Sequence, residues 1–128
     1  MNRAAMDKMV ADLQAIGSIK TVKIGLEPTL NPDDYPIIRI IPESLARTGD
    51  YFGRETTCRI YFAEPLQVYD GLIEIYDSLL QLNDQIIQIL EASATTYSAA
   101  WTDTIMDSDQ IQDYKVAMAT FTVRTHCQ

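Results

Sequence analysis

The sequence predicts an α+β domain with the element order α-β-β-β-α-β-β, in which a mostly antiparallel sheet carries a short and a long helix on one face. Two observations predict it: the spacing of the hydrophobic residues switches between helical and alternating, and turn-forming residues separate the segments. Helical spacing occupies residues 2–16 and 67–91, and strand-like spacing occupies 19–26, 35–41, 56–63, 99–106 and 114–125. By its length the chain is a single domain, residues 1–128.

The short helix, residues 2–16, repeats its hydrophobic residues at helical spacing and is expected to pack beside the long helix. The segment 35–41 is the most apolar strand candidate. Pro36 can occupy the first position of a strand without losing a ladder hydrogen bond, and Pro42 is expected to end this strand.

Two further strands are predicted from their alternation. The strand 56–63 directs Cys58, Ile60 and Phe62 inward. The closing strand, residues 114–125, has hydrophobic residues on both of its sides. That pattern is typical of a strand in the middle of a sheet, or of one covered on both faces.

The long helix, residues 67–91, has a hydrophobic arc that covers more than half of its circumference. The arc includes the rows Leu72–Leu79–Ile86 and Ile73–Leu80–Ile87, and the polar remainder includes the acids Asp70, Asp77, Asp84 and Glu91. Because a stripe of about 100° is enough to cover one sheet, this helix has hydrophobic surface to spare. We expect a second element or a second chain to cover the surplus.

The segment Glu43–Glu55 is predicted to be a long polar loop, and loops of this length are often functional or mobile. Its candidate functional residues are Arg47, Asp50, Tyr51, Phe52 and Arg54. The two aromatic residues either pack back on the core or stand ready for a partner, and the sequence leaves both possibilities open.

The formal net charge of −8 argues against sequence-specific binding of nucleic acid, which requires a basic patch. Residues 60–114 contain ten acids and no Lys or Arg, whereas residues 1–59 carry eight charges of each sign. One interpretation is solubility. The other is an acidic face that meets a basic partner, which includes the basic part of another copy.

No constellation for catalysis, a metal or a cofactor is evident. His126 stands near the end of the chain, and no nucleophile-elbow or phosphate-loop motif occurs. Asp107, Asp109 and Asp113 lack the pattern of a calcium loop and are expected to form an ordinary acidic hairpin. Because these motifs are missing, we expect no enzyme activity. With no signal-like or membrane-spanning run, we expect a cytosolic protein with reduced thiols and no membrane contact.

Two segments carry a family resemblance: Tyr35–Pro42, with the sequence YPIIRIIP, and Arg54–Phe62, with the sequence RETTCRIYF, followed by a long helix and two strands. In this order they resemble the tail terminator proteins of long-tailed bacteriophages, the relatives of the lambda-like minor tail protein U. The resemblance implies a structural virion protein of a phage or prophage, made in the host cytoplasm and resident in the tail. It would form a hexameric ring that caps the tail tube, ends tube polymerisation and meets the head–tail connector protein. Under the same resemblance, segment Glu43–Glu55 would become ordered during assembly.

Ring closure requires head-to-tail contacts between unlike surfaces. We therefore expect cations of one subunit to face acids of the next: Arg39, Arg47, Arg54 and Arg59 against Asp77, Asp84 or Asp103.

A rival interpretation has the same element order. Acidic chaperones of type III secretion systems bind unfolded effector segments as dimers, although they usually add a third helix after the last strand.

Overall fold

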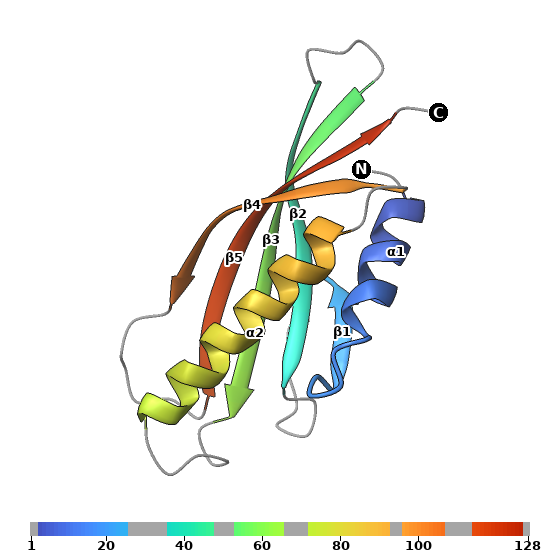
Figure 1. The fold of residues 1–128 in the computed structure, drawn as a ribbon. Coiled ribbons are helices and arrows are strands. Elements are labelled where there is room, and N and C mark those ends of the chain that lie inside the picture. The colour runs from blue at the N-terminus through green and yellow to red at the C-terminus, as the bar shows by residue number, and fades with distance from the viewer. Residues whose placement is uncertain are drawn as a thin grey trace.

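The computed structural model describes residues 3–25, 36–47, 53–65, 72–92, 96–106 and 114–126. The element order is α1 (Arg3–Leu13), β1 (Thr21–Ile24), β2 (Ile37–Arg47), β3 (Gly53–Pro65), α2 (Leu72–Ala92), β4 (Ser98–Met106) and β5 (Tyr114–His126). Both helices lie on the same face of one sheet (Figure 1). The predicted α+β class and the order α-β-β-β-α-β-β are thereby confirmed.

The five strands follow the spatial order β1-β2-β3-β5-β4. Only β1 and β2 run parallel to each other, and the remaining neighbours are antiparallel. β5 lies between β3 and β4, so the prediction of a strand in the middle of the sheet is confirmed. The two edge strands are β1, with four residues, and β4, with nine.

The core lies between the sheet and the two helices. Alternation along β3 places Cys58, Ile60 and Phe62 on the helix side, as predicted, and all three are fully buried. On β5 the helix-facing positions begin with Ala117 and Ala119, which pair with Phe62 and Ile60 across the ladder. Because alanine is small, these positions leave volume above the centre of the sheet for the larger side chains of α2.

Two polar contacts fix the rotation of α2 about its own axis. The Ser78 hydroxyl donates a hydrogen bond to the buried carboxylate of Glu64 on β3 at 2.7 Å. One and a half turns further on, the Thr104 hydroxyl of β4 donates to the buried Asn83 amide oxygen at 2.6 Å. Since an unpaired buried polar group costs about 1–3 kcal/mol, rotating α2 would be unfavourable.

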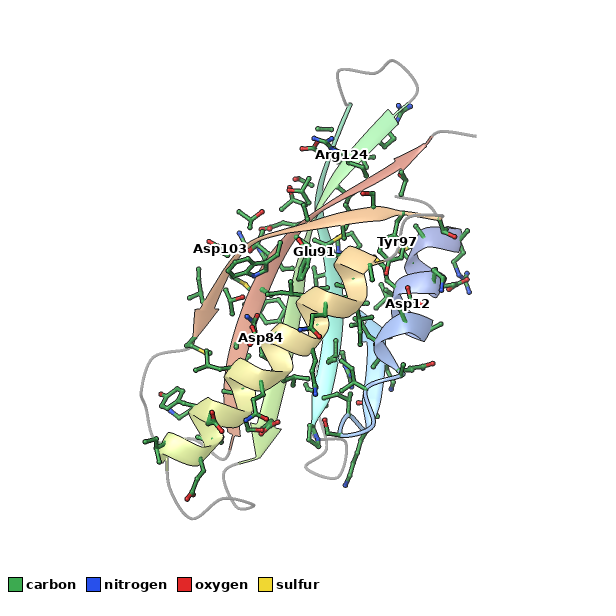
Figure 2. The ribbon with its side chains drawn as sticks, in the orientation of Figure 1. Asp12, Asp84, Glu91, Tyr97, Asp103 and Arg124 are labelled. Atoms are coloured by element: carbon green, nitrogen blue, oxygen red, sulfur yellow. The ribbon has the colours of Figure 1, made fainter. Side chains whose placement is uncertain are left out.

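α1 packs beside α2, as its spacing predicted, and buries Ala5, Met9 and Leu13 in the same core. A hydrogen bond of 2.8 Å from the Tyr97 hydroxyl to Asp12 ties α1 to the chain just before β4 (Figure 2). α1 nevertheless does not cover all of the surplus hydrophobic surface of α2. Ile73 stays 81% exposed and Leu80 stays 53% exposed.

The predicted loop Glu43–Glu55 is wrong at both of its ends. β2 continues past Pro42 to Arg47, and β3 begins at Gly53. The ladder accommodates the missing N–H of Pro42 by a register shift between Pro42 and Ser44, so the proline does not end the strand. The two strands project as a hairpin beyond the helices (Figure 1). Of the predicted loop residues, Asp50, Tyr51 and Phe52 lie outside the described residues.

The buried and exposed rows of α2 generate a paired prediction. Leu79→Asp should prevent folding, because Leu79 is 0% exposed and its replacement would bury an unpaired carboxylate. The cost of several kcal/mol is a large part of the roughly 5–15 kcal/mol that stabilises a domain. Leu80→Asp introduces the same group one position later, on the exposed side, and should fold. Circular dichroism with urea titration measures both; a folded Leu79→Asp variant would contradict the assignment of the buried row.

Candidate assembly surface

The outer side of α2 alternates hydrophobic and acidic residues along one line. The line consists of Ile73, Asp77, Leu80, Asp84, Ile87 and Glu91, which we call the α2 seam. At 100° per residue these positions lie within about 40° of one line, and the seam is about 27 Å long. Ile87 is half-buried and the other five are exposed. Each hydrophobic side chain of the seam is therefore followed, one turn later, by a carboxylate.

β4 extends this surface to the adjoining edge of the sheet. Trp101 pairs with Phe121 on the helix side of the sheet and is 41% exposed. Asp103 and Ile105 come after a register shift and are exposed on the opposite face of the sheet, the face of Arg59. The Glu91 carboxylate accepts a hydrogen bond of 3.0 Å from the backbone N–H of Trp101, which joins the end of the seam to β4. Figure 2 labels Asp84 and Glu91 on α2 and Asp103 on β4. The α2 seam thus adjoins Trp101, on the helix side of β4.

The opposite edge of the sheet has the opposite charge. Lys20, just before β1, and Lys23, within it, are both exposed. Ile24, the last residue of β1, is 41% exposed on the helix side of the sheet. The sequence pattern showed two lysines here but did not reveal that β1 is an edge strand, because strand order is not a local property. A chain with one acidic and one basic edge presents two unlike surfaces.

Arg39 does not fit its predicted role at a subunit interface. Its side chain is 0% exposed on the sheet face opposite the helices. Its Nη1 donates to the backbone oxygen of Thr21 at 3.1 Å, to the hydroxyl of Thr21 at 3.0 Å and to the backbone oxygen of Ile38 at 2.9 Å. The guanidinium therefore joins β1 to β2 within one chain, and where it lies it cannot meet an acid of a neighbour.

Arg59 has an acid of its own chain. Its Nε donates to the Glu43 carboxylate, and its Nη1 lies 3.2 Å from the sulfur of Met118. The hydrogen bond to Glu43 raises the pKa of Arg59, and the negative charge of Glu43 and the nearby Tyr61 and Asp103 act in the same direction. The Glu43 pair is thus a contact inside the chain, across β2 and β3.

The other predicted interface residues lie as follows. Arg54 is half-buried near the far end of the projecting hairpin, where it faces Arg47 across the ladder. The side chain of Arg47 is outside the described part of the structure. Asp77 and Asp84 are exposed on the α2 seam, whereas Asp103 is exposed on the opposite face of the sheet, near Arg59. Neither the predicted acids nor the predicted cations therefore gather on one surface.

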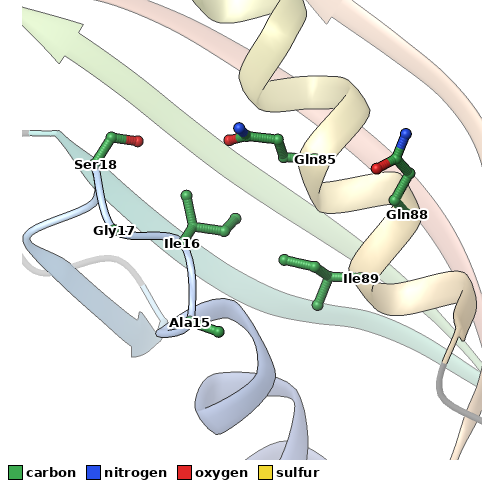
Figure 3. Close-up of a pocket in the computed structure, with 7 residues that line it drawn as sticks. All are labelled: Ala15, Ile16, Gly17, Ser18, Gln85, Gln88 and Ile89. Carbon is green, nitrogen blue, oxygen red and sulfur yellow. The ribbon is translucent and has the colours of Figure 1, made fainter.

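A cavity of about 350 Å³ opens between the turn after α1 and the middle of α2. It is lined by Ala15, Ile16, Gly17, Ser18, Gln85, Gln88 and Ile89 (Figure 3). Its described lining offers amide groups, one hydroxyl and hydrophobic surface, without an acid, a base or a thiol. The residues of this lining therefore do not form a nucleophile–base pair.

The described residues also bear on metal binding and on membrane insertion. No group of three or more His, Cys, Asp or Glu side chains in them is placed to hold a metal ion. No helix in the same residues combines the length and the hydrophobicity needed to span a membrane. The predicted acidic hairpin with Asp107, Asp109 and Asp113 lies outside the described residues, as does the side chain of His126.

The burial of Cys58 predicts how the free energy of unfolding depends on pH. Burial raises the pKa of its thiol from 9.0 to about 11. Between these values the unfolded chain releases a proton that the folded chain keeps, so the free energy of unfolding should fall as the pH rises. The contribution of Cys58 to this fall is about 1.4 kcal/mol per pH unit. Urea titrations through this window should show a shallower fall for Cys58→Ala than for the wild type; identical slopes would contradict the inward thiol.

Comparison with known proteins does not assign the chain to a family. No protein-family model matches the chain, and none of the curated proteins compared with it is significantly similar.

Proposed function

We propose that this protein is a structural component of a phage tail that assembles into a hexameric ring, caps the tail tube and provides the surface for head–tail joining. The observation that carries the proposal is the α2 seam. A single copy leaves large hydrophobic side chains, Ile73 and Leu80, exposed in line with acids on a well-packed helix. Such a surface is typical of a site that another chain covers. The element order also agrees with the order on which the resemblance to tail terminators rests.

The charge of the seam favours unlike partners over a twofold dimer. If two seams met across a twofold axis, Ile73 would face Glu91 of the other copy and Leu80 would face Asp84. Six carboxylates would then share one contact with hydrophobic side chains, and the removal of their water would be unfavourable. A head-to-tail contact avoids this, and head-to-tail contacts close into rings when their rotation is right. The seam therefore supports the ring over the chaperone-like dimer.

The β2–β3 hairpin is the element that we assign to contacts along the tail axis. It projects past both helices (Figure 1). Leu45, on this hairpin, is 61% exposed. A hairpin that leaves the body of the subunit reaches a neighbouring layer without disturbing the core. In this proposal it meets the tail-tube protein or the head–tail connector, while the acidic charge of the ring repels DNA in transit.

The first test is the mass of the protein in solution. Sedimentation velocity over a range of concentrations should show exchange between a monomer and a hexamer, and negative-stain images of concentrated protein should show closed rings. Leu80→Asp should stay folded and remain monomeric at concentrations where the wild type forms rings, because it places a further charge in the seam. Glu74→Lys, on the same helix but off the seam, is the matched control and should form rings.

Two results would contradict the proposal. A wild-type protein that is monomeric at every concentration and ionic strength would exclude the ring. A stable dimer at every concentration would favour the chaperone-like alternative, particularly if it bound an unfolded segment of a secreted protein.

The second test concerns the tail tube. When the chain is added to polymerising tail-tube protein of the same phage, tubes should stop growing and carry a ring at one end, because the ring occupies the surface that the next tube subunit needs. Electron microscopy measures tube length and the presence of the ring. Tubes that keep growing with bare ends would show that the ring, even if it forms, is not a cap.

A further inference from the structure

We infer that the β2–β3 hairpin binds its partner by strand addition. An extended, acidic segment of another tail protein pairs with the outer edge of β2, and one hydrophobic side chain of that segment enters a pocket beside Leu45. This inference rests on the proposed function, since it specifies how the hairpin meets the next layer of the tail. The α2 seam remains the ring contact.

β2 is longer than its neighbour on one side. β1 pairs only with residues 37–40, whereas β2 continues to Arg47. In the part of the chain that the structure describes, no strand lies along the outer side of this continuation, which we call the β2 edge, residues 42–47. Residues 42–46 are all exposed. An unpaired edge of this kind is a template for a further strand.

The backbone groups that face the β2 edge follow from the ladder. The carbonyl oxygen of Ile40 faces β1, because it accepts a hydrogen bond of 2.7 Å from the N–H of Gly25. Ile40 pairs with Ile60 of β3, and every second residue of an antiparallel ladder directs its N–H and C=O away from the partner strand. Counted along β3 from Ile60, the outward positions of β2 are those opposite residues 58, 56 and 54, namely Pro42, Leu45 and Arg47.

Pro42 sets the inner limit of the pairing. Its nitrogen carries no hydrogen, so it offers an added strand an acceptor but no donor. Leu45 and Arg47 offer both groups. A segment added here therefore pairs with Leu45 and Arg47 and stops at Pro42, and prolines at sheet edges limit uncontrolled pairing in this way.

A small pocket flanks the β2 edge on the helix side. Its volume is about 210 Å³, and Met6 of α1, Pro42 and Leu45 supply its hydrophobic surface. Leu45 pairs with the buried Thr56, and its own side chain is 61% exposed. Pockets for small molecules measure roughly 300–1,000 Å³, so this one suits a single side chain. Strand addition gains specificity from such pockets, because alternate side chains of the added strand enter them.

The charge of the hairpin favours an acidic segment. The register places Arg47 opposite Arg54, and like charges in opposite ladder positions repel. The acids of the hairpin already pair within the chain, Glu43 with Arg59 and Glu55 with Arg124. A carboxylate of the added segment near Arg47 and Arg54 is therefore attracted by both.

Two observations favour another protein over a second copy as the occupant. The hairpin projects beyond the layer of the two helices (Figure 1), and two hairpins edge to edge would bring their arginines together. The longer edge strand of a second copy, β4, is poorly suited, because Glu91 accepts the hydrogen bond of the Trp101 N–H and a register shift follows.

The first experiment titrates three blocked heptapeptides into the ¹⁵N-labelled protein at concentrations where it is monomeric. The first peptide alternates threonine with glutamate, a central leucine and glutamate. The second has lysine for glutamate, and the third carries N-methyl groups on the leucine and both glutamates. The amide signals of Leu45 and Arg47 should shift with the first peptide. Its dissociation constant should be at least about tenfold lower than those of the other two, which lack the charge or the strand donors.

The second experiment alters the β2 edge. Leu45→Pro removes an N–H that the ladder does not use, so it should fold and yet bind the acidic peptide at least about tenfold more weakly. Leu45→Glu keeps the backbone, repels the acidic peptide and should weaken binding similarly. Ser44→Ala, at a position that faces β3, is the matched control and should bind like the wild type. Circular dichroism measures the folding of each variant.

The third experiment returns to the tail tube. Leu45→Glu should form rings like the wild type, because the α2 seam is unchanged, but should leave tubes growing with bare ends. Electron microscopy measures rings and tube lengths, and Ser44→Ala should cap tubes normally.

The outcomes separate this inference from the proposed function. If the acidic peptide binds at the β2 edge but the wild type neither forms rings nor stops tubes, the proposed function falls and the strand-addition site stands. If the wild type caps tubes and Leu45→Glu caps them equally well, or the peptide leaves Leu45 and Arg47 unshifted, the function stands and this inference is wrong. Equal binding of the three peptides also overturns it. If Leu45→Glu loses the ring itself, the β2 edge joins copies of this chain, and the inference is overturned.

Discussion

The packing of α2 on the centre of the sheet is the constraint on which the rest of this structure depends. α2 has hydrophobic residues around more than half of its surface, but one sheet face receives only part of that arc. Ala117 and Ala119 on β5 leave room for Leu79 and Ile86, which are fully buried in the same core. Once this row faces inward, the row with Ile73 and Leu80 has to face outward, because the helix is rigid.

Two polar contacts fix which row of α2 faces the sheet. A purely hydrophobic arc tolerates some rotation, since one aliphatic row can replace its neighbour at modest cost. The hydrogen bonds of Ser78 with Glu64 and of Asn83 with Thr104 tolerate much less, because rotation would leave buried polar groups without partners. The first contact fastens β3 to α2 and the second fastens β4 to α2, and Glu91 adds a further attachment to β4 at Trp101. Packing inside the chain therefore determines which side chains stay at its surface.

The electrostatic character of the surface follows from the same arrangement. Several arginines make contacts within the chain: Arg39 joins β1 to β2, and Arg59 and Arg124 pair with acids across the ladder. The acids of α2 and β4 stay at the surface, and the lysines at β1 stay at the other edge. In the proposed ring, two unlike edges suit head-to-tail contact, and the alternation of hydrophobic and acidic residues in the seam disfavours contact between two seams.

The sequence by itself determined the local features: the order of the elements, the amphipathic spacing of both helices, the inward row of β3 with Cys58 and the excess of hydrophobic surface on α2. These depend on the periodicity of neighbouring residues, which each segment carries with it. Only the tertiary structure decided the strand order, the continuation of β2 past Pro42 and the burial of Arg39. It also decided which hydrophobic row of α2 stays at the surface and which charges reach the two edges. Each of these depends on pairing between segments far apart in the chain, where a bulge, a buried hydrogen bond or a neighbouring strand changes what the local pattern favours.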